Sequence, residues 1–246
     1  ICSWVEAGVT SHGSDRRLRI ALVEPFLGGS HRAWAEGYAQ HSRYDVELFG
    51  LPAAHWKWRM HGGHVTLAAR IAAAVAERGP FDLVLASDMT NVAALLGLAR
   101  REIGEAPVAV YMHENQLTFP RAPDDREDLT YAMVNWTSMV AADLVIFNSE
   151  FHRGSWFGAL PGLLARMPDQ RHSRLVESVA DRSTVLPVGA DLAALDCIER
   201  TANDRPVLLW NQRWQLDKGP DQFAVALAVL LDVGLEFDVA LAGDRA

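Results

Sequence analysis

The chain lacks most features that would assign a protein to a class at once. It has only two cysteines, Cys2 and Cys197, which are far apart and do not show the spacing of metal ligands. Reduced cysteines with a structural role are therefore expected, as is usual in the cytoplasm. No apolar run reaches the ~18 residues of a membrane span, so no membrane association is predicted. The net charge of −8 excludes a basic field over the whole chain, although a local patch can still bind nucleic acid.

The two ends of the chain also lack expected features. Residues 1–17 have no periodic pattern and no signal-peptide character, and they are predicted to form a disordered leader. Residues 237–242 read as a core strand, after which the sequence stops. A central strand is normally covered on both faces, so we expect the last domain to be incomplete.

Between the ends, apolar strands alternate with helical patterns. Strands are predicted from Leu18 into the first glycine turn and then over 45–49, 81–86, 107–112, 144–147 and 184–187. Helices are predicted over 31–41, with Ser30 as N-cap, and over 64–78, 91–101, 129–142, 150–157, 160–166 and 173–180. Loops are expected over 52–63 and 118–128. This order is typical of an α/β fold with a doubly wound parallel sheet.

A second unit is predicted after the first. Residues 18–190 are expected to form one Rossmann-like domain, followed by a linker over 191–206. Residues 207–246 then begin a second Rossmann-like domain, with strands over 207–211 and 237–242 around a helix over 220–233.

The turn after the first strand is the first candidate ligand site. Its residues Gly28, Gly29, Ser30 and His31 lead from a buried strand into a helix, where backbone amides can face a ligand. The alternative is a tight structural turn. The pattern is not the G-x-G-x-x-G of dinucleotide-binding proteins, so a nicotinamide site is not predicted.

Polar residues also follow two later strands. His113, Glu114, Asn115 and Gln116 follow a fully apolar strand, and their polar side chains favour acid–base work or binding of sugar hydroxyls over a simple hydrogen-bonded loop. Asp88 ends another strand and is interpreted either as a base or as a helix N-cap. No second His or Cys stands at ligand spacing, so no metal is predicted.

Two further stretches carry cations. Trp56, Lys57, Trp58 and Arg59 alternate aromatic and basic side chains, which can stack on bases or sugars; the alternative is one core tryptophan beside solvated cations. Arg213 and Lys218 flank a turn before a helix, which suggests a diphosphate clamp rather than a solvated turn. Residues 166–174 are basic and are interpreted as a solvated segment.

Taken together, these motifs resemble the tRNA-queuosine α-mannosyltransferases. The resemblance rests on four stretches, which are residues 24–31, 51–59, 113–116 and 210–214, the last together with Asp217 and Lys218. It implies a two-domain GT-B architecture related to the group 4 glycosyltransferases. It also implies retaining transfer of mannose from GDP-mannose to queuosine in the anticodon loop of tRNA-Asp.

The resemblance further implies roles for the candidate residues. Arg213 and Lys218 match the cations that hold the donor diphosphate, so no metal cofactor is required. The Gly28–Gly29 turn would approach that diphosphate, and His113 with its neighbours would line the sugar site. The glutamate pair of the group 4 donor domain has no counterpart up to Ala246. A group 4-like enzyme with a lipid or saccharide acceptor, and a non-catalytic module that binds tRNA or a nucleotide sugar, remain the alternatives.

Overall fold

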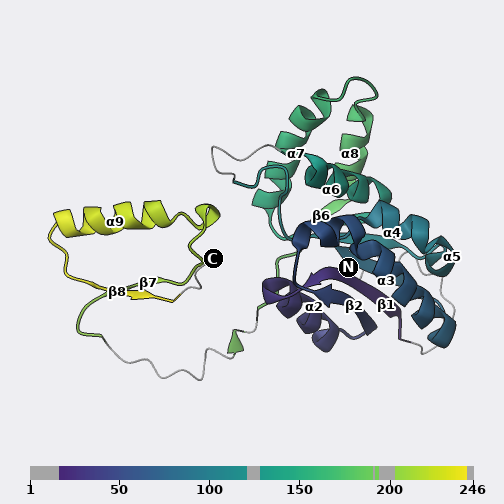
Figure 1. The fold of residues 1–246 in the computed structure, drawn as a ribbon, viewed down its shortest axis with the longest axis horizontal. Coiled ribbons are helices and arrows are strands. Elements are labelled where there is room, and N and C mark those ends of the chain that lie inside the picture. Colours follow the sequence, from purple (N-terminus) through teal and green to yellow (C-terminus); the bar gives the residue numbers. More distant parts are fainter. Residues whose placement is uncertain (1–16, 121–127, 191, 194–202, 243–246) are drawn as a thin grey trace.

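The computed structural model of the chain describes residues 17–120, 128–190, 192–193 and 203–242. Its larger unit is a six-stranded sheet in which all neighbouring strands are parallel, in the order β2-β1-β3-β4-β5-β6. Figure 1 shows this sheet with helices around it. The strands are β1 (Arg19–Leu27), β2 (Asp45–Pro52), β3 (Leu83–Ser87), β4 (Val108–Met112), β5 (Leu144–Phe147) and β6 (Ser183–Val185). The predicted α/β fold with a parallel sheet is confirmed.

Alternate residues of the strands enter two separate cores, as the pleat of a strand requires. One core contains Val23, Val84 and Val110 and is covered by side chains of α3, α4, α6, α7 and α8. The other contains Leu22, Leu85 and Tyr111 and is covered by α2. The helices are α2 (Gly29–His41), α3 (Trp56–Arg78), α4 (Val92–Leu98), α5 (Arg100–Ile103), α6 (Thr130–Ala141), α7 (Glu150–Ala165) and α8 (Ser173–Asp181).

Helix α3 begins at Trp56 rather than at residue 64, so the expected loop over 52–63 is largely wrong. Gly62 and Gly63, which close the expected loop, both lie inside the helix. A Cβ on Gly63 would lie 3.1 Å from the Pro25 Cβ, so this glycine lets α3 pack closely against β1. Tertiary packing therefore decides the start of the helix against local propensity.

Two other helix predictions are also corrected. The helices predicted over 150–157 and 160–166 are one helix, α7, with Pro161 inside it. One side of α7 buries Trp156, Leu160 and Leu164, and this burial outweighs the one hydrogen bond that Pro161 removes. The helix predicted over 91–101 is divided into α4 and α5 at Ala99.

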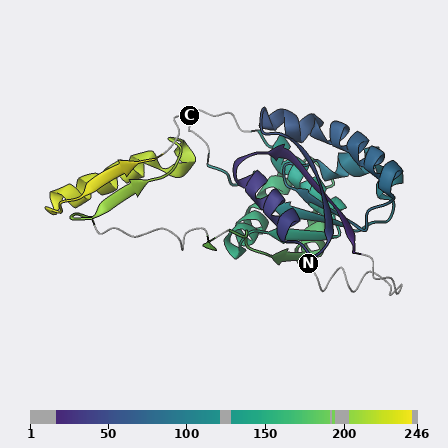
Figure 2. The same cartoon turned by 90° about the horizontal axis from the view of Figure 1, so that it is seen from below.

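The smaller unit is a parallel pair of strands with one helix. It contains β7 (Val207–Trp210), the short 3-10 helix η2 (Leu216–Lys218), α9 (Pro220–Asp232) and β8 (Asp238–Leu241). Trp210 packs against Trp214 and Phe223, with ring centroids 5.2 and 4.9 Å apart. Figure 2 shows this unit, in green and yellow, beside the larger one. Most of the predicted linker over 191–206 lies outside the described residues.

Candidate functional site

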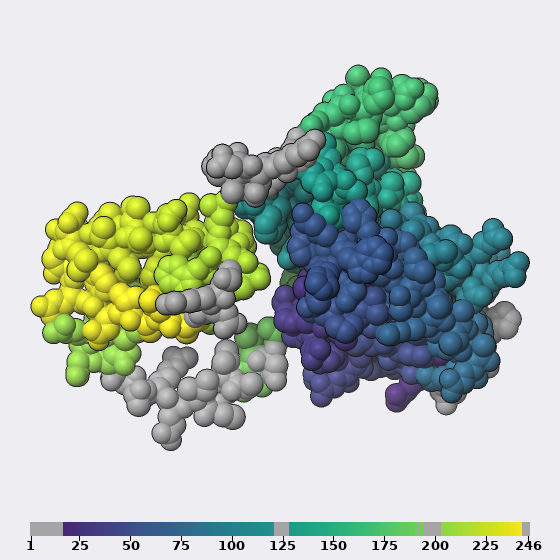
Figure 3. Space-filling model, in the orientation of Figure 1, coloured from purple at the N-terminus to yellow at the C-terminus, as the bar shows by residue number. Residues whose placement is uncertain are grey.

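A cleft opens at the carboxyl ends of the larger unit's strands, where α/β proteins bind ligands. Its volume is about 840 Å³, and Figure 3 shows the hollow between the two units. The predicted site residues that line it are Gly28, Gly29, Ser30, His31, Trp56, Glu114, Gln116 and Arg213. Those that do not line it are Lys57, Trp58, Arg59, Asp88, His113, Asn115 and Lys218. The four predicted stretches therefore meet around one cavity.

Each glycine of the turn is favoured at its position, one by a close contact and the other by its backbone conformation. Gly28 is extended, but a Cβ on it would lie 2.3 Å from the Ala53 Cβ at the end of β2. Gly29 has a positive φ of 51°, which favours glycine. Helix α2 begins at Gly29 without a side-chain cap, so the prediction of Ser30 as N-cap is wrong. The tight turn and the cleft wall are thus the same structure.

A buried Glu–His pair lies beneath this turn. The Glu24 Oε2 atom is 2.9 Å from the His31 Nδ1 atom, and the other carboxylate oxygen accepts the Phe26 amide hydrogen at 2.8 Å. Burial lowers the pKa of His31, but the hydrogen bond and charge of Glu24, with the charges of Asp88 and Glu114, outweigh it and raise the pKa to about 9. His31 is therefore a cation at neutral pH and faces the cleft.

The pKa of His113 is shifted in the opposite direction to that of His31. Its ring lies among those of His31, Trp34 and Tyr111, with centroids 4.5 to 4.7 Å away. Burial, followed by the charges of His31 and His152, lowers the pKa of His113 to about 3. Its Nε2 atom is buried and has no hydrogen-bond partner within the described part of the chain. This nitrogen is buried and His113 does not line the cleft, so a direct contact of His113 with a sugar stays a prediction.

Asp88 positions the loop that carries His113. Its two carboxylate oxygens accept the backbone N–H groups of His113 and Glu114, at 3.2 and 3.1 Å. Asp88 is not a helix cap, because the cap of α4 is Asn91, so that alternative is wrong. Burial raises the pKa of Asp88 to about 7, although the charge of His31 opposes this. The suggested role of Asp88 as a base stays a prediction.

The remaining residues of the loop also have defined partners. The Asn115 side-chain oxygen accepts the amide hydrogens of Leu117 and Thr118, which makes Asn115 a turn former. The Gln116 Nε2 atom donates to the Glu114 carboxylate at 3.2 Å, and both residues line the cleft. Glu114 and Gln116 are therefore the members of this motif that are best placed to meet a ligand.

Sequence reasoning did not select Glu24 as a site residue. A carboxylate that directly follows the apolar run of β1 is the signal that could have identified Glu24. Ligand atoms of Glu24, His31 and His113 lie within 4.8 Å of one another and could hold a metal ion.

One cation of the smaller unit, Arg213, reaches the cleft, and a second, Lys218, lies close to it in the sequence. Arg213 lines the cleft together with Gln215 and Asp217. The Lys218 Nζ atom forms an ion pair with Asp217 at 3.0 Å, just before the beginning of α9.

Within the described ranges, no helix is long and apolar enough to cross a membrane.

Comparison with known proteins supports the motif resemblance. A family model described as the N-terminal domain of tRNA-queuosine alpha-mannosyltransferase matches residues 19–190, which span every strand of the larger unit. A curated Drosophila melanogaster tRNA-queuosine alpha-mannosyltransferase is 31% identical over 244 residues. That alignment covers 94% of this chain, and the chain spans 63% of the length of that relative. The chain therefore belongs to the tRNA-queuosine alpha-mannosyltransferase family.

Proposed function

We propose that this chain takes part in the retaining transfer of mannose from GDP-mannose to queuosine in the anticodon loop of tRNA-Asp, in the cytoplasm. One observation carries the proposal. The region matched by the family model contains the glycine turn, the His113 loop and the start of α3, which border one cleft. The fly relative is named for the same reaction class.

On the donor side, we assign neutralisation of the diphosphate charge to Arg213 and Lys218. Arg213 lines the cleft that is also bordered by Gly28 and Gly29, so a diphosphate between them would meet a guanidinium and a closely approaching backbone. Lys218 lies near the beginning of α9, whose amides also favour an anion. These groups would stabilise the charge that develops on the leaving phosphate, without a divalent metal.

On the sugar side, three groups have different charge states. Glu114 offers a carboxylate that is oriented by Gln116, and His31 offers a positive charge at the cleft wall. The neutral ring of His113 packs against the ring of His31 behind these groups. Glu114 can accept hydrogen bonds from sugar hydroxyls, and His31 can favour negative charge on the phosphate.

Donor binding is tested first, by thermal unfolding with GDP and with GDP-mannose. A ligand at a hundredfold excess over Kd stabilises the folded state by about 2.7 kcal/mol, so Tm should rise. Arg213→Ala should weaken binding about tenfold, the loss expected when one charge-assisted contact is removed. Arg205→Ala is the matched control, because Arg205 pairs with Glu236 outside the cleft. EDTA should not change the response.

Transfer is tested with radiolabelled GDP-mannose and tRNA-Asp that either contains or lacks queuosine. Label should enter only the queuosine-containing tRNA. Equal labelling of both tRNAs, or labelling of a lipid or saccharide instead, would contradict the proposed acceptor. Donor binding without any transfer would identify a binding module and reject catalysis by this chain.

A further inference from the structure

An aromatic and cationic surface lies where α3 begins. We call it the α3 surface and define it by the residues Trp56, Lys57, Trp58, His61 and Tyr131. Trp56 and Trp58 are 38% and 63% exposed, and Trp56 also lines the cleft. Both indoles belong to the first turn of α3, where residues two positions apart project from different sides of the helix end. Two exposed indoles at one helix end indicate an interaction site.

The first half of this surface is held in place by a buried ring. Tyr131 of α6 is buried, and its ring centroid lies 4.8 Å from that of Trp56 and 5.3 Å from that of His61. The Lys57 Nζ atom lies 5.5 Å from the centroid of Trp56 and 5.8 Å from that of Tyr131. Trp56 is therefore supported from behind, with a cation beside it.

The second half rests on a glycine. A Cβ on Gly62 would lie 2.9 and 3.0 Å from the Cζ2 and Cη2 atoms of Trp58. The indole of Trp58 therefore lies directly against the backbone of α3, in space that any larger residue would occupy. This contact supports the ring while most of the side chain stays exposed, which is the arrangement of a stacking platform.

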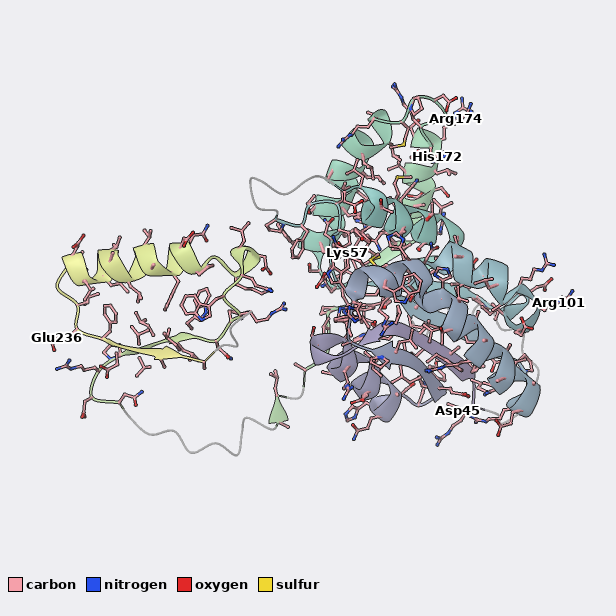
Figure 4. All side chains as sticks on the ribbon, in the orientation of Figure 1. Asp45, Lys57, Arg101, His172, Arg174 and Glu236 are labelled. Carbon is pink, nitrogen blue, oxygen red and sulfur yellow. The ribbon has the colours of Figure 1, made fainter. Side chains whose placement is uncertain are left out.

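The charge of this region suits an anionic chain. The first turn of α3 has no acidic residue, whereas Lys57, Arg59 and His61 bring basic groups to the start of the helix. Among the described residues, Asp128 is an acidic group close to these cations. Hydrogen bonds from Thr130 chiefly lower the pKa of Asp128, and the charges of Lys57 and His61 contribute. In Figure 4, Lys57 lies at the end of α3 nearest the smaller unit, and Arg101 lies on the opposite side of the larger unit.

We infer that the α3 surface binds a single-stranded RNA loop, with Trp58 and Trp56 stacking on unpaired bases and Lys57 contacting the phosphate backbone. The inference rests on the proposed function, which supplies a tRNA acceptor. Unpaired bases expose their faces to aromatic rings, while bases in a duplex are already stacked on each other. A loop held on this surface would present its bases beside the cleft that Trp56 borders.

The test is RNA binding by fluorescence anisotropy at a fixed, stated salt concentration. The probes are the anticodon stem-loop of tRNA-Asp and a duplex with the sequence of its stem. The stem-loop should bind more tightly than the duplex. Trp58→Ala should weaken stem-loop binding about tenfold, as expected for the loss of one base–aromatic stack, and should leave duplex binding unchanged. Trp58→Phe should retain most of the affinity.

Two further variants and two controls sharpen the test. Gly62→Ala keeps every aromatic side chain but displaces Trp58, so it should reproduce part of the Trp58→Ala loss. Lys57→Ala should weaken binding of both RNAs and reduce its salt dependence. Val65→Ala removes an exposed apolar side chain (57% exposed) from the same helix, and Arg101→Ala removes a distant cation. Neither control should change stem-loop binding, and urea unfolding confirms that each variant folds.

The outcomes separate this inference from the proposed function. Stem-loop binding that is unchanged in Trp58→Ala, or an equal loss with Val65→Ala, would overturn the RNA surface even if mannose transfer is observed. Stem-loop binding that depends on Trp58, in a protein that transfers no mannose, would support the surface and reject the proposed reaction.

Discussion

Replacing Gly28 with alanine tests whether the glycine turn is shaped by packing. The new Cβ would lie 2.3 Å from the Ala53 Cβ, whereas carbon atoms in contact lie about 3.5–4.0 Å apart. The backbone would have to move by roughly 1.2 Å, the difference between these separations. It is held by the hydrogen bond from the Gly28 amide to the Phe26 carbonyl oxygen, 2.9 Å long. Overpacking of this kind costs about 1–3 kcal/mol.

The backbone conformation of Gly28 makes the interpretation clean. Its φ of −163° is extended and is open to any residue, so the loss in Gly28→Ala is steric. Gly29→Ala is the matched control, because its φ of 51° is strained for alanine while a Cβ there has no atom within 4 Å. We expect that control to cost about 1–2 kcal/mol through the left-handed conformation alone.

The assay is urea unfolding of a double-mutant cycle. Ala53→Gly removes the atom that the new Cβ meets, so it should recover about 1 kcal/mol or more of the loss in Gly28→Ala. The same substitution should recover nothing in Gly29→Ala. A free energy of unfolding that is unchanged in Gly28→Ala would refute the close approach. Equal recovery of both glycine variants by Ala53→Gly would refute the steric explanation.

Two further predictions concern the buried polar groups. The folded pKa of His31 is raised from 6.5 to about 9, so its contribution to stability is complete below pH 6.5 and is lost as pH rises to 9. The loss is on the order of 3 kcal/mol. Urea unfolding should therefore show that the free energy of unfolding falls as pH rises through this range, and Glu24→Gln should make this fall smaller. An equal fall in the variant would contradict the pairing of Glu24 with His31. Asp88→Ala leaves two backbone N–H groups without their acceptor and should lower the free energy of unfolding by about 2–4 kcal/mol. Asp88→Asn keeps one acceptor and should lose about half as much, so a loss as large as that of Asp88→Ala would indicate that the charge matters more than the hydrogen bonds.

The sequence alone was sufficient to predict the parallel sheet and the edge of the sheet at which the candidate site lies. Strands such as Val108–Met112 are apolar on both faces, which is the pattern of a buried parallel strand. The polar residues that follow them must then meet at one edge, because the carboxyl ends of parallel strands point the same way. The resemblance to the family is likewise contained in the sequence, since its motifs are local runs of residues.

Only the tertiary structure decided how the site residues act. Glu24, His31 and His113 are brought together from β1, α2 and the loop after β4, and no local pattern in the sequence encodes their contact. Their opposite pKa shifts depend on how each ring is buried and which charges face it. Likewise, Gly62 and Gly63 look like helix breakers in the sequence. They lie within α3 because one supports Trp58 and the other contacts Pro25, and local propensity is too weak to oppose such packing.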